Sequence, residues 1–210
     1  MGIQTLENSL MGPCRGITGL IYWQYSVTTQ EVTLTMKVIL DSRQIKETLE
    51  DMVRRIVAET PPDSILAVVG IRSRGEVLAQ RLVTLLKTKT GQDIPCGTLD
   101  ITLYRDDLNS PHRTAQPHVR TTDITFDVDD KMIVLVDDVL FTGRSTRAAL
   151  DALIDLGRPK AIRLAVLIDR AGREFPIQAD YAGLKTNISP EQRVYVYLTE
   201  SDDKDEVVVE

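Results

Sequence analysis

The residues best suited to chemistry stand in one short run. The apolar segment Val134–Val136 is followed directly by Asp137 and Asp138, and then by the polar segment Thr142–Thr146, which leads into a helical pattern. Hydroxyls, a glycine and backbone amides at a helix start suit a phosphate dianion, because the free N–H groups and the helix dipole point at it. The two carboxylates would repel that phosphate, so they suit sugar hydroxyls or a magnesium ion. A ribose 5-phosphate satisfies both halves of the run.

Two other interpretations of this run compete with a sugar-phosphate site. A strand ending in Asp-Asp also resembles the magnesium-holding strand of a nucleotide hydrolase, but such a site needs a Gly-x-x-x-x-Gly-Lys-Ser/Thr loop that this chain lacks. A buried strand followed by a polar helix cap explains one hydroxyl but not two adjacent acids. The sugar-phosphate site is therefore the favoured interpretation.

The elements that precede this run predict alternating strands and helices. A short apolar run, Lys37–Leu40, comes before a helix that Asp41 can cap with Gln44 three residues on, and Pro61-Pro62 ends this helix. Its apolar stripe at helical spacing consists of Ile45, Leu49, Met52, Val53, Ile56 and Val57. A buried strand, Ile65–Val69, a turn at residues 70–75 and a second helix ending near Gly91 follow.

The second half of the chain repeats this alternation. Leu99, Ile101 and Leu103 alternate with polar residues and predict a strand, and residues 108–122 predict a long mobile loop of functional type. The further expected elements are strands at Met132–Val136 and Ile162–Ile168, a helix at Ser145–Leu156 and a late edge strand at Val194–Leu198. This order predicts an α/β fold, a mostly parallel central sheet flanked by helices, with the ligand at the carboxyl ends of the strands.

Composition narrows the class of protein. With 42% hydrophobic and 27% charged residues and a net charge of -6, the chain is typical of a globular protein that does not coat nucleic acid by bulk electrostatics. No apolar run is long enough to span a membrane. Cys14 and Cys96 stand far apart, which predicts no disulfide and favours a cytoplasmic location. Residues 200–210 predict a solvated acidic tail or an edge strand.

Residues 1–35 lack any clear period and look foreign to the domain. We expect them to be a non-domain leader, either extra translated sequence or an extension, with the domain at residues 36–210 and Met36 as the natural start. N-terminal mass analysis of protein made from its own gene tests this, and a product that begins at Met1 would contradict it.

Three runs give the chain a resemblance to a known family. They are Leu99–Leu108, Val134–Thr146 and Ala165–Ile177. The second resembles the signature of type I phosphoribosyltransferases, which bind 5-phosphoribosyl-1-pyrophosphate (PRPP). All three, in this order, resemble the PyrR family of pyrimidine operon regulators with uracil phosphoribosyltransferase activity. The resemblance implies the type I phosphoribosyltransferase fold, in which a small hood covers the site.

The resemblance also assigns roles to residues. It implies that the turn after the second strand binds pyrophosphate, that Tyr104 and Arg105 begin a loop that closes over the reacting centre, and that Arg170 positions the nucleotide or uracil. Arg105 and Asp138 would be catalytic, and Asp137 and Asp138 would meet Mg²⁺ indirectly, through Mg-PRPP. Arg173 and Glu174 can simply pair with each other and stay outside the set. The implied substrate-binding set is Arg72, Ser73, Arg74, Tyr104, Arg105, Asp137, Asp138, Val139, Leu140, Phe141, Thr142, Gly143, Arg144, Ser145, Thr146 and Arg170.

The implied reaction converts uracil and PRPP to UMP and pyrophosphate. The resemblance further implies a homodimer or larger homo-oligomer and UMP-dependent binding of pyrimidine operon leader RNA. Glu50 and Glu59 on the first helix would repel RNA phosphates, and Gly183–Ser189 departs from the family's usual Gly-Lys-Asn-x-Pro-Thr-Ser. A non-catalytic UMP-sensing regulator and a phosphoribosyltransferase without an RNA role therefore remain alternatives.

Overall fold

The structure is a computed structural model that describes residues 36–106 and 121–210. The expected leader, residues 1–35, lies outside these residues, as does most of the expected loop at residues 108–122. The start of the domain at Met36 thus stays a prediction. No helix in the described part of the chain is long and apolar enough to cross a membrane.

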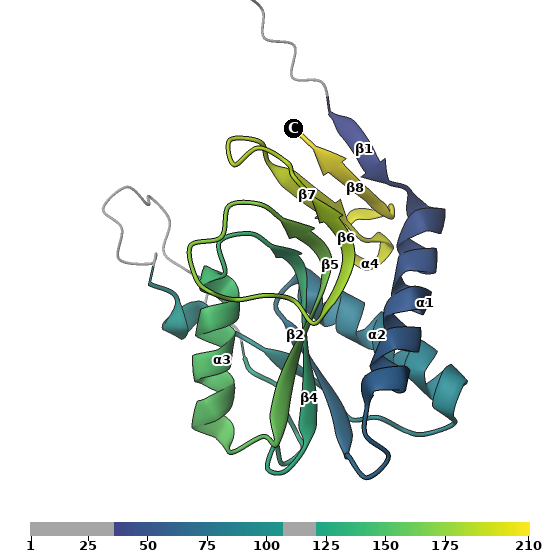
Figure 1. The fold of residues 1–210 in the computed structure, drawn as a ribbon, viewed down its shortest axis with the longest axis vertical. Coiled ribbons are helices and arrows are strands. Elements are labelled where there is room, and N and C mark those ends of the chain that lie inside the picture. The colour runs from purple at the N-terminus through teal and green to yellow at the C-terminus, as the bar shows by residue number, and fades with distance from the viewer. Residues whose placement is uncertain (1–35, 107–120) are drawn as a thin grey trace, which may run out of the picture. The chain divides into compact units, whose positions relative to one another are not determined.

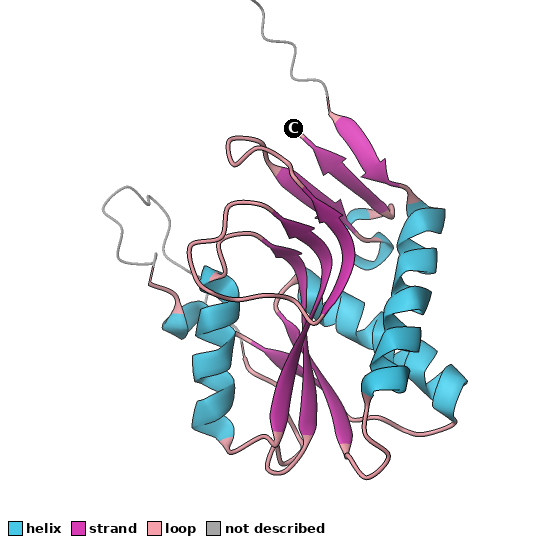
Figure 2. Cartoon of the chain, in the orientation of Figure 1, coloured by secondary structure: helices cyan, strands magenta, loops and turns pink. Residues whose placement is uncertain are grey.

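A five-stranded parallel sheet forms the centre of the fold, with helices beside it (Figure 2). Helices α1 (Ser42–Glu59) and α2 (Arg74–Thr90) lie on one face of the sheet, and α3 (Arg144–Leu156) lies on the other (Figure 1). The predicted α/β architecture is confirmed. The strand order is β3 (Cys96–Leu99), β2 (Leu66–Ile71), β4 (Met132–Leu140), β5 (Ala161–Arg170) and β6 (Tyr181–Thr186).

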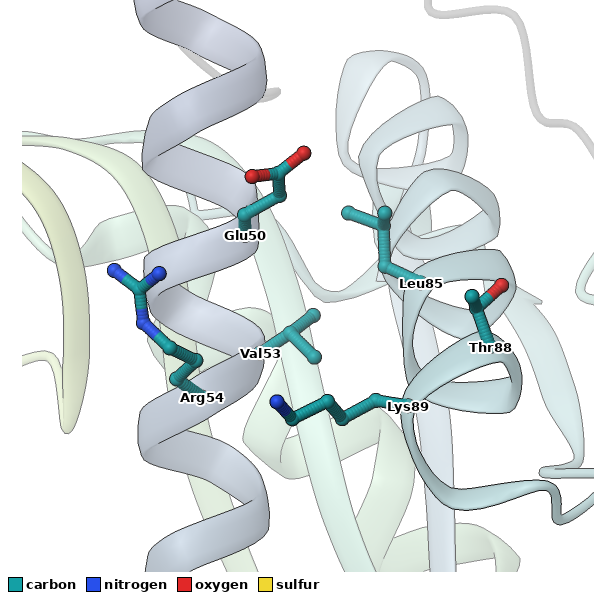
Figure 3. A pocket seen from close by; sticks show the side chains of 6 residues that line it. All are labelled: Glu50, Val53, Arg54, Leu85, Thr88 and Lys89. Carbon is teal, nitrogen blue, oxygen red and sulfur yellow. The ribbon is translucent and has the colours of Figure 1, made fainter.

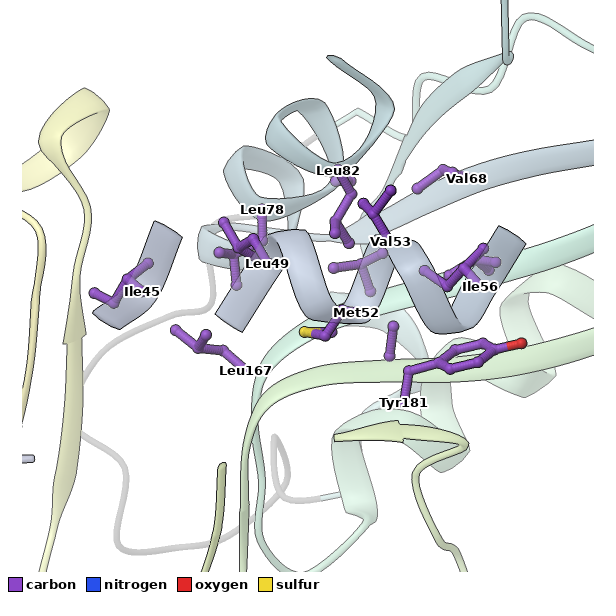
Figure 4. Packing of buried hydrophobic residues seen from close by; sticks show 14 of the residues in the cluster. Ile45, Leu49, Met52, Val53, Ile56, Val68, Leu78, Leu82, Leu167 and Tyr181 are labelled. Carbon is purple, nitrogen blue, oxygen red and sulfur yellow. The ribbon is translucent and has the colours of Figure 1, made fainter. Parts of the chain in front are cut away.

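The strands are apolar along their length because both faces of the sheet are covered. Val68 and Val134 pack against α1 and α2, while their neighbours Val69 and Leu135 pack against α3. Figure 4 shows the first of these clusters, in which the stripe of α1 meets α2 and the sheet. Burying each such side chain stabilises the fold by about 1.5–3 kcal/mol.

Helix α1 begins and ends where the sequence predicts. Asp41 Oδ1 accepts a hydrogen bond from the Gln44 amide at 2.8 Å, and the Asp41 amide donates to Gln44 Oε1 at 2.9 Å. The helix ends at Glu59, two residues before Pro61, whose ring would clash with the preceding turn. The buried stripe is Ile45, Leu49, Met52, Val53 and Ile56.

A small antiparallel sheet, in the order β1 (Lys37–Leu40), β8 (Glu206–Val209) and β7 (Val194–Tyr197), forms the hood together with α4 (Thr199–Asp202). The predicted edge strand is β7. The interpretation of residues 200–210 as a solvated tail or edge strand is wrong, because β8 is the central strand and Val207, Val208 and Val209 are buried. The three valines are buried because β8 pairs with β1, which comes from the other end of the domain.

Two other strand predictions need correction. The alternating run 98–103 forms a strand only as far as Leu99, because the Asp100 carboxylate accepts bonds from the amide and hydroxyl of Thr102 and turns the chain into a 3-10 helix, η1 (Thr102–Tyr104). Leu103 is accordingly 75% exposed. Strand β6 was not predicted, since its short sequence has no regular alternation of apolar side chains.

Candidate active site

The order of the strands creates a crevice between β2 and β4. From β2 the chain moves to β3 on one side, and from β4 it moves to β5 and β6 on the other, so the direction of winding reverses between β2 and β4. Ligands of open α/β sheets bind at such a switch point, beyond the carboxyl ends of the strands. The turn at residues 72–75 and the run at residues 137–146 follow these two neighbouring strands. The fold thus brings together the two segments that the sequence placed in one site.

Gly75 sets how closely the turn after β2 approaches β4. A Cβ atom on Gly75 would lie 2.5 Å from the carbonyl oxygen of Val136 and 3.1 Å from the Cα of Asp137. Gly70 allows the same closeness within the turn, where its Cβ would meet the Gly75 carbonyl oxygen at 2.5 Å. The start of α2 therefore lies directly against the backbone that carries the carboxylates.

The two carboxylates lie on the last residues of β4, which runs to Leu140 and so continues past the predicted end at Val136. Asp137 is 8% exposed and Asp138 is partly buried. Their recorded hydrogen bonds come from the backbone: the Asp138 amide donates to Asp137 at 2.9 Å and the Val139 amide to Asp138 at 2.8 Å. Burial, and then the charge of Asp138, raise the pKa of Asp137 well above its usual range; burial also raises the pKa of Asp138. Two adjacent, largely buried carboxyl groups favour a cationic or hydroxyl-bearing ligand, which would stabilise their charged forms.

The segment after β4 forms a small cavity of about 140 Å³. Gly143 caps α3 with φ +91, a left-handed conformation that glycine adopts without strain. The first-turn amides of α3 are unpaired within the helix and border this space. Thr146, 2% exposed, contributes a buried hydroxyl. The lining residues are Val139, Leu140, Phe141, Thr142, Gly143, Ser145 and Thr146.

Within residues 139–146, Arg144 is the residue that is not part of the lining of this cavity. Its guanidinium pairs with Asp106 at 2.7 Å and with Glu174 at 2.6 Å. It links the end of η1 and the segment after β5 to the phosphate loop, which we define as residues 141–146. Because Arg144 takes Glu174, and Arg173 bonds Asp169, the suggested Arg173–Glu174 pair does not form.

The turn that was predicted to bind pyrophosphate presents two arginines. Arg72 pairs with Glu76 at 3.4 Å and Arg74 with Asp202 at 3.0 Å, and the peptide bond between Arg72 and Ser73 is cis. The Nε atoms of both arginines are buried without a hydrogen-bond partner among the described residues. Donors in that state suit an anion with several oxygens.

The side chains of Tyr104 and Arg105 have different partners. Arg105 lies close enough to Asp137 for its charge to lower the pKa of that carboxyl in part. The Tyr104 hydroxyl instead donates to Asp155 at 2.7 Å, eleven residues beyond the start of α3, or roughly 16 Å along the helix axis. The charge of Arg105 thus reaches the Asp137 carboxyl. The Tyr104 hydroxyl is held at the far part of α3, although the Tyr104 carbonyl accepts a hydrogen bond from Arg147, in the first turn of that helix, at 2.9 Å.

Arg170 at the end of β5 is 5% exposed and holds the segment between β6 and β7. Its guanidinium donates to the carbonyl oxygens of Gln192 at 2.8 Å and Ser189 at 2.5 Å, and it lies 4.1 Å from the centre of the Phe141 ring. Arg170 thereby ties this segment to the phosphate loop. The adjacent cavity, of about 340 Å³, is lined by Asp169, Arg170, Ala171, Lys185, Thr186 and Asn187.

Several residues of this neighbourhood were not predicted. Arg173 bonds the carbonyls of Leu140 and Phe141 and the carboxylate of Asp169, which fixes the phosphate loop to β5. Asp169 lies in a run that was already singled out, so its position beside Arg170 was an available signal. No sequence signal pointed to Asp202, because this residue bonds to Arg74, which is 128 residues away in the sequence.

Comparisons with known proteins identify the family. Residues 35–200 match the phosphoribosyl transferase domain family. The bifunctional protein PyrR of Syntrophobacter fumaroxidans is 48% identical over 174 residues, 83% of this chain and 92% of that protein. The bifunctional protein PyrR of Ligilactobacillus salivarius is 48% identical over 169 residues, 80% of this chain and 95% of that protein. The chain belongs to the PyrR family. Membership confirms the predicted phosphoribosyltransferase class.

Solved structures place the PyrR-family fold among phosphoribosyltransferases. The hypoxanthine-guanine phosphoribosyltransferase of Bacillus anthracis superposes with a TM-score of 0.63 at 16% identity, covering 82% of this chain and 96% of that one. The hypoxanthine phosphoribosyltransferase of Trypanosoma cruzi gives 0.62 at 17% identity, covering 82% and 95%. The fold predicted from the resemblance is therefore confirmed.

Proposed function

We propose that this PyrR-family protein transfers the phosphoribosyl group of PRPP to uracil, giving UMP and pyrophosphate. The observation that carries the proposal is the meeting of three subsites at one switch point. The carboxylates of Asp137 and Asp138 stand between the phosphate loop, residues 141–146, and the arginine-bearing turn, residues 72–75. PRPP has a ribose between a 5-phosphate and a pyrophosphate, so its chemistry matches this arrangement.

The chain's own residues supply binding and charge rather than a nucleophile. The amides and hydroxyls of the phosphate loop hold the 5-phosphate, and Asp137 and Asp138 hold the ribose hydroxyls. The guanidinium groups of Arg72 and Arg74 meet the pyrophosphate, on which negative charge grows as the glycosidic bond breaks. Arg105, whose charge acts on Asp137, adds positive charge near the reacting atoms.

Magnesium fits this site as an ion that arrives with PRPP. The described residues contain no group of three or more acidic, histidine or cysteine side chains that would hold a metal alone, but Asp137 and Asp138 offer two adjacent carboxylates. These two residues would meet Mg²⁺ indirectly, through the PRPP whose oxygens bind the ion. When bound, Mg²⁺ neutralises charge on the leaving pyrophosphate.

An assay across nucleobases tests the proposed reaction. Purified protein with PRPP and Mg²⁺ is expected to convert uracil to UMP and to leave hypoxanthine, guanine, adenine and cytosine unchanged. The cavity beside Arg170 is the proposed base subsite. Tight UMP binding without turnover would contradict the enzymatic proposal, and preference for a purine would contradict the assignment of the base.

Ser145→Ala tests the phosphate loop. Ser145 lines the cavity, and loss of a hydroxyl bond to a charged phosphate is expected to raise the KM for PRPP about tenfold, with little change in the KM for uracil. Initial rates at varied PRPP check this. Ser64→Ala, at the amino end of β2, is the matched control, and an equal change in both variants would contradict a specific role for Ser145.

We also propose that the protein binds pyrimidine operon leader RNA in a UMP-dependent manner. Glu59, one of the two acids expected to repel RNA, lies near the buried Tyr181 phenol, whose pKa is raised first by burial and then by the charge of Glu59. Glu50, the other, lines a cavity of about 280 Å³ between α1 and α2 together with Lys89 (Figure 3). Both acids are exposed, so an RNA that approaches α1 would meet their negative charge.

A gel shift with the leader RNA of the organism's own pyrimidine operon, with and without UMP and at stated salt, tests this second proposal. Helix α1 carries four basic and four acidic residues, and Arg54 already pairs with Asp51 at 2.8 Å. We therefore expect a weak dependence of RNA affinity on salt, since few phosphates are neutralised. No shift at low salt would contradict an RNA role and leave the enzymatic proposal intact.

Self-association belongs to the same proposal. Leu103, Ile154 and Leu156 are exposed apolar side chains, and we propose that a further copy of the chain covers them. Light scattering is expected to give the mass of a dimer or larger assembly, and a monomer mass would contradict it.

A further inference from the structure

The acidic segment at residues 199–205 docks on one face of α2. Arg74 and Arg81 are seven residues apart, about two helical turns, and therefore project from the same side of the helix. Arg81 bonds Glu200 at 2.8 Å and Asp205 at 2.7 Å, while Arg74 bonds Asp202 at 3.0 Å. The hood is thus tied to the helix that begins at the pyrophosphate turn.

Two hydrogen bonds to the backbone of Leu198 hold Asp202 in place. Its Oδ2 accepts a hydrogen bond from the amide of Leu198 at 3.0 Å, and its amide donates to the Leu198 carbonyl at 2.7 Å. Leu198 is fully buried, and the Asp202 side chain is only 18% exposed. The carboxylate therefore offers Arg74 a fixed acceptor.

Arg74 lies between Asp202 on the hood and Asp138 on β4. Its bonds to Asp202 use Nη2, and its charge acts on Asp138, whose pKa it lowers in part. Its Nε is buried without a partner among the described residues, and the side chain is 35% exposed. A single edge of the guanidinium is anchored, which leaves other donors for an anion in the crevice.

We propose that Asp202 is a positioning residue that orients Arg74 toward the pyrophosphate of PRPP. This inference rests on the proposed pyrophosphate-binding role of the turn at residues 72–75. A competing role, in which Asp202 occupies Arg74 and weakens pyrophosphate binding, predicts the opposite sign for the same substitution. Positioning fits the contacts better, because the Leu198 amide already fixes Asp202 and the Nε of Arg74 remains without a partner.

Asp202→Asn keeps an acceptor for the Leu198 amide and removes the charge that holds Arg74. We expect the KM for PRPP, and the KM for pyrophosphate in the reverse reaction, to rise about tenfold, whereas the KM for uracil and for UMP stays unchanged. Asp203→Asn is the matched control, because Asp203 is the adjacent, exposed acid of the same segment. Asp202→Glu restores the charge and is expected to recover part of the PRPP affinity.

A double-mutant cycle with Arg74→Gln separates positioning from a structural effect. In the Arg74→Gln background, Asp202→Asn is expected to cause no further loss of PRPP affinity, because its effect passes through Arg74. Calorimetric titration of the full chain with PRPP alone supplies the affinities without requiring turnover, and melting temperatures show that each variant is folded.

Each result has a defined meaning. An unchanged or lower KM for PRPP in Asp202→Asn overturns positioning, as does an equal additional loss in the Arg74→Gln background. If the wild-type protein binds PRPP without converting uracil, the proposed reaction fails while the cycle still tests Asp202. If the wild-type protein does not bind PRPP, both proposals fall.

Discussion

Replacing Asp137 by asparagine is expected to lower kcat/KM for UMP synthesis by about 100- to 1000-fold and to raise the melting temperature of the ligand-free protein. The loss of activity follows from the loss of a charge at the ribose and its magnesium ion, an effect comparable to removal of a preorganised electrostatic group. The gain in stability has a separate cause, because Asp137 is 8% exposed next to Asp138 and both burial and that neighbour raise its pKa.

The dependence on pH fixes the sign of the stability effect. An aspartate whose pKa is raised on folding makes the folded state progressively less stable as the pH rises above the unfolded value of about 3.9, and the cost reaches its full size once the pH exceeds the raised pKa of the folded state. The melting temperatures of Asp137→Asn and wild type should therefore agree near the unfolded pKa and diverge as the pH rises. Asparagine keeps an oxygen for the Asp138 amide, so the local hydrogen bond survives.

Steady-state kinetics and thermal melts between acidic and neutral pH check both parts. Asp63→Asn, an exposed acid before β2, is the control and should change neither quantity. Wild-type turnover in Asp137→Asn would contradict the proposed role of the carboxylate pair. A lower melting temperature at neutral pH would contradict the electrostatic cost assigned to it.

Gly75→Ala is expected to lower the free energy of unfolding by about 2 kcal/mol or more and to weaken PRPP binding at least tenfold. The added Cβ would lie 2.5 Å from the carbonyl oxygen of Val136, a backbone atom that cannot move without shifting β4. Overpacking of this kind costs about 1–3 kcal/mol and exceeds the roughly 1 kcal/mol by which alanine favours a helix over glycine. The turn that carries Arg72 and Arg74 would be displaced from Asp137 and Asp138.

Urea unfolding and PRPP titration measure these two effects. Gly91→Ala is the control: its Cβ meets nothing within 4 Å, so the cost of about 1 kcal/mol comes only from its left-handed backbone, φ +73. Equal losses of stability in the two variants would show that the close approach of the turn to β4 is unimportant. Full PRPP affinity in Gly75→Ala would show that the turn does not need this position.

Much of the candidate site is formed by residues that are neighbours in the sequence. In residues 134–146 a buried strand, two acids and a phosphate-type loop follow one another directly, so the strand, the carboxylates and the helix start could be predicted from neighbouring residues alone. Helix α1 was predictable for the same reason, because its capping box joins residues three apart. These features depend on residues that are close together in the sequence, so a local pattern is enough to predict them.

Other features depend on contacts that exist only in the folded molecule. The acidic end of the chain became a central strand because Val207–Val209 pair with β1, and the strand predicted through Leu103 stopped at Leu99 because Asp100 turned the chain. Arg74 found Asp202 at a separation of 128 residues, which no local pattern encodes. The sequence by itself predicted the class of ligand, since the groups proposed to bind the ribose and its 5-phosphate are contiguous. The tertiary structure decided which groups support that ligand from a distance, since burial and charge pairing between remote segments arise only when the sheet and the hood come together.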